Sequence, residues 1–120
     1  MRLVLVDDNG RFLDAARDLL EREGMTVVAV ASSSAEALAV VKGERPDAVL
    51  VDIDLGAESG LDLAVQLAAE DWPVILISAY DLEDYGELID ASPAIGFVSK
   101  PLLSARAIAD VLASGSPEKQ

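Results

Sequence analysis

The chain has 120 residues, and its 22 acidic and 9 basic side chains give a formal net charge of −13 at pH 7. It contains no histidine and no cysteine, which excludes disulfides, thiol nucleophiles, Ser-His-Asp triads and zinc sites built from these ligands. The negative charge argues against direct binding to nucleic acid or to an anionic membrane, and no apolar run approaches the roughly 18 residues of a membrane span. A hydrophobic share of 52% is enough for one core. We therefore expect a single small, soluble and cytoplasmic domain.

Five short apolar runs rich in β-branched residues predict strands, at Leu3–Val6, Val27–Ala31, Ala48–Val51, Val74–Ile77 and Ile95–Val98. They do not alternate with polar residues, which is typical of strands covered on both faces. The segments between them have helical spacing, and three apolar stripes stand out: Phe12, Ala15, Ala16, Leu19 and Leu20; Leu82, Tyr85, Leu88 and Ile89; Ala105, Ile108, Val111 and Leu112. The order predicts one doubly wound (βα)5 domain of the α/β class, a five-stranded parallel sheet with helices on both faces.

Helix boundaries are also predicted. Ser33, Ser59 and Asp81 each precede an acidic residue by three positions, a spacing typical of helix N-termini. Gly24 stands where the first helix should end. We expect the domain to span residues 1–113, and residues 114–120 to form a flexible C-terminal tail or the stub of a linker.

Polar side chains follow four of the five predicted strands. Asp7 and Asp8 follow the first, Asp52 the third, Ser78 the fourth, and Ser99 and Lys100 the fifth. Because the carboxyl ends of parallel strands meet at one edge of the sheet, these groups should lie close together there. Clustered carboxylates repel one another unless a cation lies among them, and Mg²⁺ prefers oxygen ligands of this kind. A divalent cation, a lysine and a hydroxyl around one carboxylate could stabilise a transferring phosphoryl group, with Asp52 as its nucleophile.

At these residues the sequence resembles the receiver domain of bacterial two-component response regulators. Asp7-Asp8, Asp52, Ser78-Ala79 and Lys100-Pro101 occur in the order and spacing of that family, over residues 2 to about 113. The resemblance implies a flavodoxin-like fold with strand order 2-1-3-4-5.

The resemblance also implies roles for single residues. Asp52 would accept phosphate from a sensor histidine kinase or a phosphotransfer protein, and Mg²⁺ (or Mn²⁺) would be held by Asp7, Asp8, Asp52 and the backbone carbonyl of Asp54. Ser78 and Lys100 would contact the phosphoryl oxygens, Phe97 would be the rotating aromatic switch, and the Lys100–Pro101 peptide bond would be cis. A homodimer through the fourth helix, fifth strand and fifth helix is also expected.

Three positions depart from the family pattern. Gly56 replaces a frequent proline four residues after Asp52, so we expect a looser loop. Asp54 and Tyr80 flank the route of an attacking water, and we interpret them as tuning the lifetime of the phosphate. Tyr80 could shield the acyl phosphate, whereas Asp54 could orient water or repel charged donors.

Each candidate residue has a simpler reading when taken alone. The aspartates could be turn or cap residues, Ser78 a local hydrogen-bonding group, Lys100 a surface cation and Phe97 a core residue. Their joint placement favours the functional interpretation. The strongest rival is a haloacid-dehalogenase-like phosphatase, because Asp52-Ile53-Asp54 matches its Asp-x-Asp motif; the acidic pair lies upstream rather than downstream, which counts against it. A second rival is an interaction module on the same fold that needs no phosphorylation.

Overall fold

The structure is a computed structural model. It describes residues 1–79 and 82–114, and for residues 82–85 it describes the backbone only. Five parallel strands form one sheet in the order β2-β1-β3-β6-β7. Their bounds are β1 (Arg2–Val6), β2 (Thr26–Ala31), β3 (Ala48–Asp52), β6 (Val74–Ser78) and β7 (Gly96–Ser99). Counted by themselves, these five strands follow the order 2-1-3-4-5, which confirms the predicted doubly wound, flavodoxin-like fold.

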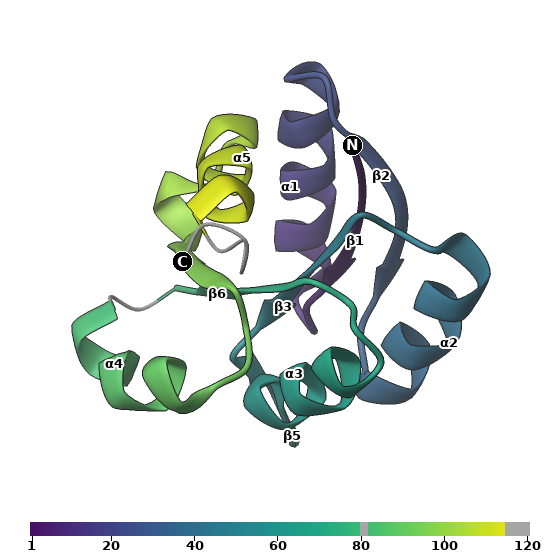
Figure 1. The fold of residues 1–120 in the computed structure, drawn as a ribbon. Helices are drawn as coiled ribbons and strands as arrows, with labels where there is room; N and C mark the ends of the chain where they lie inside the picture. Colours follow the sequence, from purple (N-terminus) through teal and green to yellow (C-terminus); the bar gives the residue numbers. More distant parts are fainter. Residues whose placement is uncertain (80–81, 115–120) are drawn as a thin grey trace.

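Helices cover both faces of the sheet (Figure 1). One face is covered by α1 (Gly10–Arg22) and α5 (Ala105–Ser114), and the other by α2 (Ser34–Glu44), α3 (Gly60–Ala69) and α4 (Leu82–Ala91). The expected tail therefore starts within the last turn of α5, and residues 115–120 lie outside the described residues. No helix in the described segments is long and apolar enough to cross a membrane.

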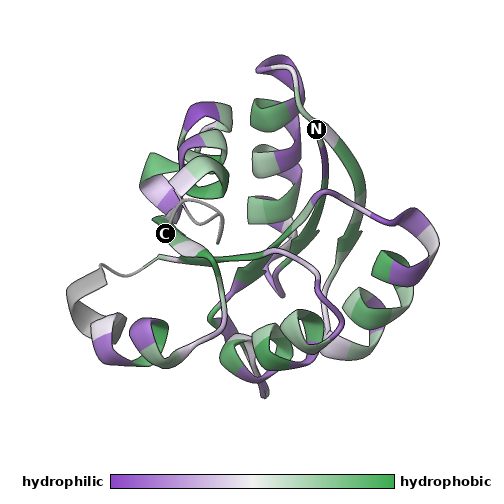
Figure 2. Cartoon of the chain, in the orientation of Figure 1, coloured by the Kyte–Doolittle hydropathy of each residue, from purple (hydrophilic) through white to green (hydrophobic). Residues whose placement is uncertain are grey.

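The two faces of the sheet bury separate apolar clusters. Along β1, Val4 and Val6 join the cluster under α2 and α3, whereas Leu3 and Leu5 join the one under α1 and α5. Successive side chains of a strand point to opposite faces, so a strand covered on both sides needs apolar residues at every position. Figure 2 shows this distribution, with hydrophobic strands and hydrophilic outer helix faces.

Two of the predicted helix caps are confirmed. The hydroxyl of Ser33 accepts the N–H of Glu36 at 3.2 Å, and that of Ser59 accepts the N–H groups of Leu61 and Asp62. The third predicted cap, Asp81, lies outside the described residues. Gly24 follows α1 with φ +95°, a left-handed conformation that favours glycine.

The buried stripe of α1 differs from the predicted one. Leu13, Ala16 and Leu20 are buried, whereas Ala15 is exposed and Phe12 is only half-buried. Asn9 fixes the first turn because its side chain accepts the N–H groups of Arg11 and Phe12. In this orientation Leu13 is buried in the core, and Phe12 packs against the outside of the same cluster.

A small hairpin, absent from the sequence prediction, joins β3 to α3. Strands β4 (Asp54–Leu55) and β5 (Glu58–Ser59) pair antiparallel, and Gly56 has φ +72° in the turn. Proline could not take this φ, and the Gly56 N–H also donates to Asp54 Oδ1 at 3.0 Å. The loop that we expected to be loose therefore has its own ladder and side-chain hydrogen bond.

Gly60, the first residue of α3, packs directly on the backbone of Asp52. A Cβ at this position would collide with the Asp52 carbonyl oxygen, and the Gly60 N–H donates to the Ile53 carbonyl at 2.8 Å. Glycine thus lets the helix start against the end of β3.

We predict that Gly60→Ala lowers the free energy of unfolding by about 2 kcal/mol, because backbone must move to admit the methyl group. Gly43→Ala in α2 is the matched control: its Cβ would meet nothing within 4 Å, and alanine favours the helix by roughly 0.5–1 kcal/mol. Urea unfolding of both variants measures the difference. Equal stabilities would contradict the close packing.

Candidate functional site

The candidate site lies at the carboxyl edge of the sheet, where the four neighbouring strands β1, β3, β6 and β7 end. Asp7 follows β1, and its N–H donates to the Ala31 carbonyl of β2 at 3.0 Å. Asp52 is the last residue of β3 and Ser78 the last residue of β6. Lys100 follows the edge strand β7 and begins the 3₁₀ helix η1 (Lys100–Leu102). The order of the strands therefore brings residues nearly a hundred positions apart to one place.

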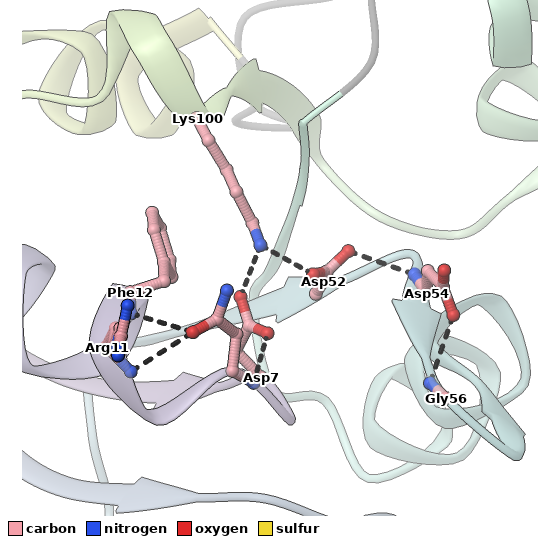
Figure 3. A network of polar contacts seen from close by, with 8 residues as sticks. Asp7, Arg11, Phe12, Asp52, Asp54, Gly56 and Lys100 are labelled. Carbon is pink, nitrogen blue, oxygen red and sulfur yellow. Dashed lines mark hydrogen bonds and ion pairs between the residues drawn. The ribbon is translucent and has the colours of Figure 1, made fainter.

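The centre of the site is an ion pair shared by two buried carboxylates. The Lys100 Nζ lies 2.6 Å from Asp7 Oδ2 and 2.8 Å from Asp52 Oδ2 (Figure 3). Asp7 is 0% exposed and Asp52 is 5% exposed. One ammonium thus faces two carboxylates that water scarcely reaches, an arrangement that strengthens their electrostatic interaction.

Backbone N–H groups orient the second oxygen of each carboxylate. Asp7 Oδ1 accepts the N–H of Asn9, and Asp52 Oδ1 accepts the N–H of Asp54, both at 2.9 Å. Each aspartate therefore bonds to the backbone two residues further on, as aspartates do in Asx turns. The Oδ2 atoms are left pointing at the ammonium.

Burial raises the pKa of the Asp52 carboxyl above its usual value, and the nearby charge of Asp7 adds to this, against the hydrogen bonds from Lys100 and Asp54. Burial of the Lys100 ammonium acts to lower its pKa, but its hydrogen bonds to Asp52 and Asp7 outweigh burial, so the pKa of Lys100 is raised. The lysine thus stays charged at neutral pH, whereas the negative charge on Asp52 is costly.

A third carboxylate completes an acidic cluster. Asp7, Asp8 and Asp52 each offer one oxygen, and these three oxygens lie within 4.8 Å of one another. Asp8 is exposed, and a Cβ at Gly56 would come within 2.8 Å of its Oδ2, so glycine leaves room for this carboxylate.

The donor set of this cluster fits a hard divalent cation. Three carboxylates and the one ammonium sum to −2 (−3 + 1). Asp7 Oδ2 is buried and accepts no hydrogen bond from the described residues beyond its ion pair with Lys100. Oxygen ligands and an excess of negative charge are the features that Mg²⁺ binding requires.

Comparison with known proteins identifies the family. The family model of the response regulator receiver domain matches residues 3–112. The chain belongs to this family. The receiver domain of two-component response regulators predicted from sequence is thereby confirmed, and the alternative of a haloacid-dehalogenase-like phosphatase finds no support.

Individual relatives agree with this assignment. The polar-differentiation response regulator DivK of Brucella anthropi is 31% identical over 104 residues, which cover 83% of this chain and 84% of DivK. A LuxR-family two-component response regulator from an Aurantimonas species is 27% identical with a TM-score of 0.83, over 93% of this receiver domain and 84% of that chain. A Burkholderia pseudomallei response regulator, solved with a phosphorylated aspartic acid, calcium ion and citrate, is 25% identical with a TM-score of 0.81 over 98% and 70% of the two chains.

The receiver domain is a signalling domain that occurs within longer proteins. This chain spans 56%, 43% and 28% of the length of the first three curated relatives that it matches. One of them is a protein-glutamate methylesterase/protein-glutamine glutaminase of Haloarcula marismortui.

The remaining predicted site residues lie around the ion pair. Ser78 is buried at the end of β6, the neighbour of β3, and pairs in register with Ser99. Phe97 is half-buried in β7 and packs against the cluster under α2, α3 and α4. The Asp54 side chain is exposed and turned into its own hairpin, towards the Gly56 N–H. Tyr80 lies outside the described residues.

The predicted cis peptide bond at Lys100–Pro101 is wrong. No peptide bond in the described residues is cis. Pro101 instead belongs to η1, where the fixed φ of proline suits the start of a helix and its missing N–H is not needed. The Leu103 N–H closes this turn on the Lys100 carbonyl at 3.2 Å.

Two contacts between distant segments, one at the site and one between the hairpin and α2, were missed from sequence. The Phe12 ring, which we had placed in a core stripe, lies over the Lys100 ammonium with Nζ 4.3 Å from its centroid. Glu58 of the hairpin accepts the Ser34 N–H at the start of α2, at 2.9 Å, and so ties the hairpin to that helix. Neither contact has a local sequence signal, since 88 positions separate Phe12 from Lys100 (100 − 12) and 24 separate Ser34 from Glu58.

We predict that Lys100→Met lowers the free energy of unfolding by about 3 kcal/mol in metal-free buffer, because two buried carboxylates lose their counter-charge. Lys42→Met, on the exposed surface of α2, is the control and should change it by less than about 0.5 kcal/mol. Urea unfolding measures both. If the two variants proved equally stable, the ion pair would not hold the site together.

Proposed function

We propose that this receiver domain accepts a phosphoryl group on Asp52 from the phosphohistidine of a sensor histidine kinase or of a phosphotransfer protein. An Asp52 oxygen would attack phosphorus, the bond from phosphorus to the histidine nitrogen would break, and an acyl phosphate would form. The observation that carries the proposal is the position of the Lys100 ammonium, 2.8 Å from Asp52 Oδ2. From there it can stabilise the negative charge of a transferring phosphoryl group. The domain would thus catalyse only its own phosphorylation and dephosphorylation.

We assign Mg²⁺ (or Mn²⁺) as the cofactor. Asp7, Asp8, Asp52 and the backbone carbonyl of Asp54 would hold it, supported by the three clustered carboxylates. When bound, the ion would supply the positive charge that lets the anionic donor approach this acidic edge.

Phosphorylation would switch a partner-binding face. A hydrogen bond from Ser78 to a phosphoryl oxygen would draw its hydroxyl inward, and Phe97 would rotate into the space behind it. The face formed by α4, β7 and α5 would then bind an output partner or a second copy of the domain. Phosphorylation would shift the equilibrium between an inactive and an active conformation that both exist beforehand. A nearly complete shift needs the active conformation to be stabilised by roughly 5.5 kcal/mol more than the inactive one.

We further propose that the domain is cytoplasmic and comprises residues 1–113. The kinase is the partner, and neither nucleic acid nor a membrane is bound directly, in keeping with the net charge of −13.

We predict that acetyl phosphate with Mg²⁺ adds one phosphoryl group to the wild type, measured by intact mass, and that Asp52→Asn abolishes the addition. Without Mg²⁺ the wild type should be labelled far less. Asp18→Asn, an exposed aspartate on α1, is the control and should be labelled like the wild type. Labelling that persists in Asp52→Asn would place the acceptor elsewhere.

We also predict that Asp54 and Tyr80 tune the lifetime of the phosphate. Tyr80→Ala should speed dephosphorylation severalfold by admitting water, and Asp54→Asn should change the rate because a charge beside the water route is removed. The measurement is the decay of the labelled species by intact mass after removal of acetyl phosphate. Unchanged rates in both variants would disprove a tuning role.

A further inference from the structure

Lys100 has a third contact besides its two carboxylates. Its Nζ lies 4.3 Å from the centroid of the Phe12 ring, within the range of a cation–π interaction. The Lys100 side chain is 15% exposed, so little water competes for the ammonium. The negative face of an aromatic ring attracts a cation more strongly when the cation is desolvated.

Phe12 is fixed by the same residues that form the site. Its N–H donates to Asn9 Oδ1 at 3.2 Å, and the Asn9 N–H donates to Asp7 Oδ1 at 2.9 Å. Asp7 Oδ2 in turn lies 2.6 Å from Lys100 Nζ. Consecutive contacts thus link Lys100 to the backbone of Phe12, and the Phe12 ring lies beside the ammonium, as Figure 3 shows.

An aromatic ring and a carboxylate differ in how strictly they orient the lysine ammonium. A carboxylate fixes the direction of an N–H donor, whereas the ring attracts the charge without requiring a particular hydrogen-bond direction. During phosphoryl transfer the ammonium must exchange a carboxylate oxygen for a phosphoryl oxygen. A lysine stem has four rotatable bonds, and a non-directional contact keeps its charged end in place during this exchange.

We propose that Phe12 is a positioning residue that holds the Lys100 ammonium at Asp52 through a cation–π contact while the phosphoryl group is transferred. This rests on the function proposed above. This role distinguishes Phe12 from an ordinary core residue, whose effect on phosphoryl transfer would depend only on the size of its side chain.

The test separates the charge of the ring face from its size. Phe12 is replaced by 4-fluoro-, 3,5-difluoro- and 3,4,5-trifluorophenylalanine, which keep the shape nearly constant while weakening the negative face. The rate of labelling by acetyl phosphate at fixed Mg²⁺ should fall stepwise, to about fivefold below wild type with three fluorines. Phe12→Tyr should retain most of the rate, and Phe12→Leu should lose as much as the trifluoro variant. Leu19→Ala, a half-buried position on the same helix, loses packing without contacting Lys100 and should be labelled at the wild-type rate.

A second measurement does not depend on phosphorylation. A double-mutant cycle of Phe12→Leu and Lys100→Met, followed by urea unfolding in metal-free buffer, should show that the two substitutions are coupled, with a factor of about five in the folding equilibrium constant. Equal labelling rates across the fluorinated series, or no coupling in the cycle, would overturn the positioning role. A wild type that is not labelled at all would overturn the proposed function, and with it Phe12's part in the transfer, even where the cycle shows coupling.

Discussion

The charge balance around one ammonium governs the structure of this site. Two buried carboxylates, Asp7 and Asp52, share Lys100, and a third, Asp8, adds a further negative charge. Removing ions from water is costly, and a buried ion pair repays that cost only when its geometry is good and its remaining oxygens are bonded. The N–H groups of Asn9 and Asp54 provide those bonds, so the two carboxylates are held in fixed orientations.

The strand order sets this geometry. β1 and β3 are neighbours, with Val6 paired to Val51, so the residues that follow them, Asp7 and Asp52, emerge side by side. Lys100 follows β7, which is separated from β3 by β6, a distance of roughly 10 Å between strand axes. A long, flexible side chain is needed to cross the end of β6, and lysine is such a side chain. Two apolar clusters pack on the two faces of the sheet and hold the strands in register beneath the ion pair.

The electrostatics of the site favour the binding of a cation. Burial raises the pKa of Asp52, and the cluster keeps an excess of negative charge in spite of Lys100. A divalent cation among the three carboxylates would relieve that excess. The contact between α1 and Lys100 extends the site beyond the motif residues, through Phe12.

The sequence by itself determined the parallel α/β fold, the five strands within about a residue at each end, and the edge at which Asp7, Asp52, Ser78 and Lys100 meet. It could do so because apolar runs without alternation mark strands buried on both faces, and parallel strands end at one edge. Only the tertiary structure decided that Phe12 contacts the ammonium as well as the core, that Gly56 turns a hairpin, that Gly60 packs on the Asp52 backbone and that the Lys100–Pro101 bond is trans. These features depend on contacts between distant segments and on the rotation of a helix about its axis. Local propensity carries no information on either, because a shift of one residue in a helix changes its buried face without changing its composition.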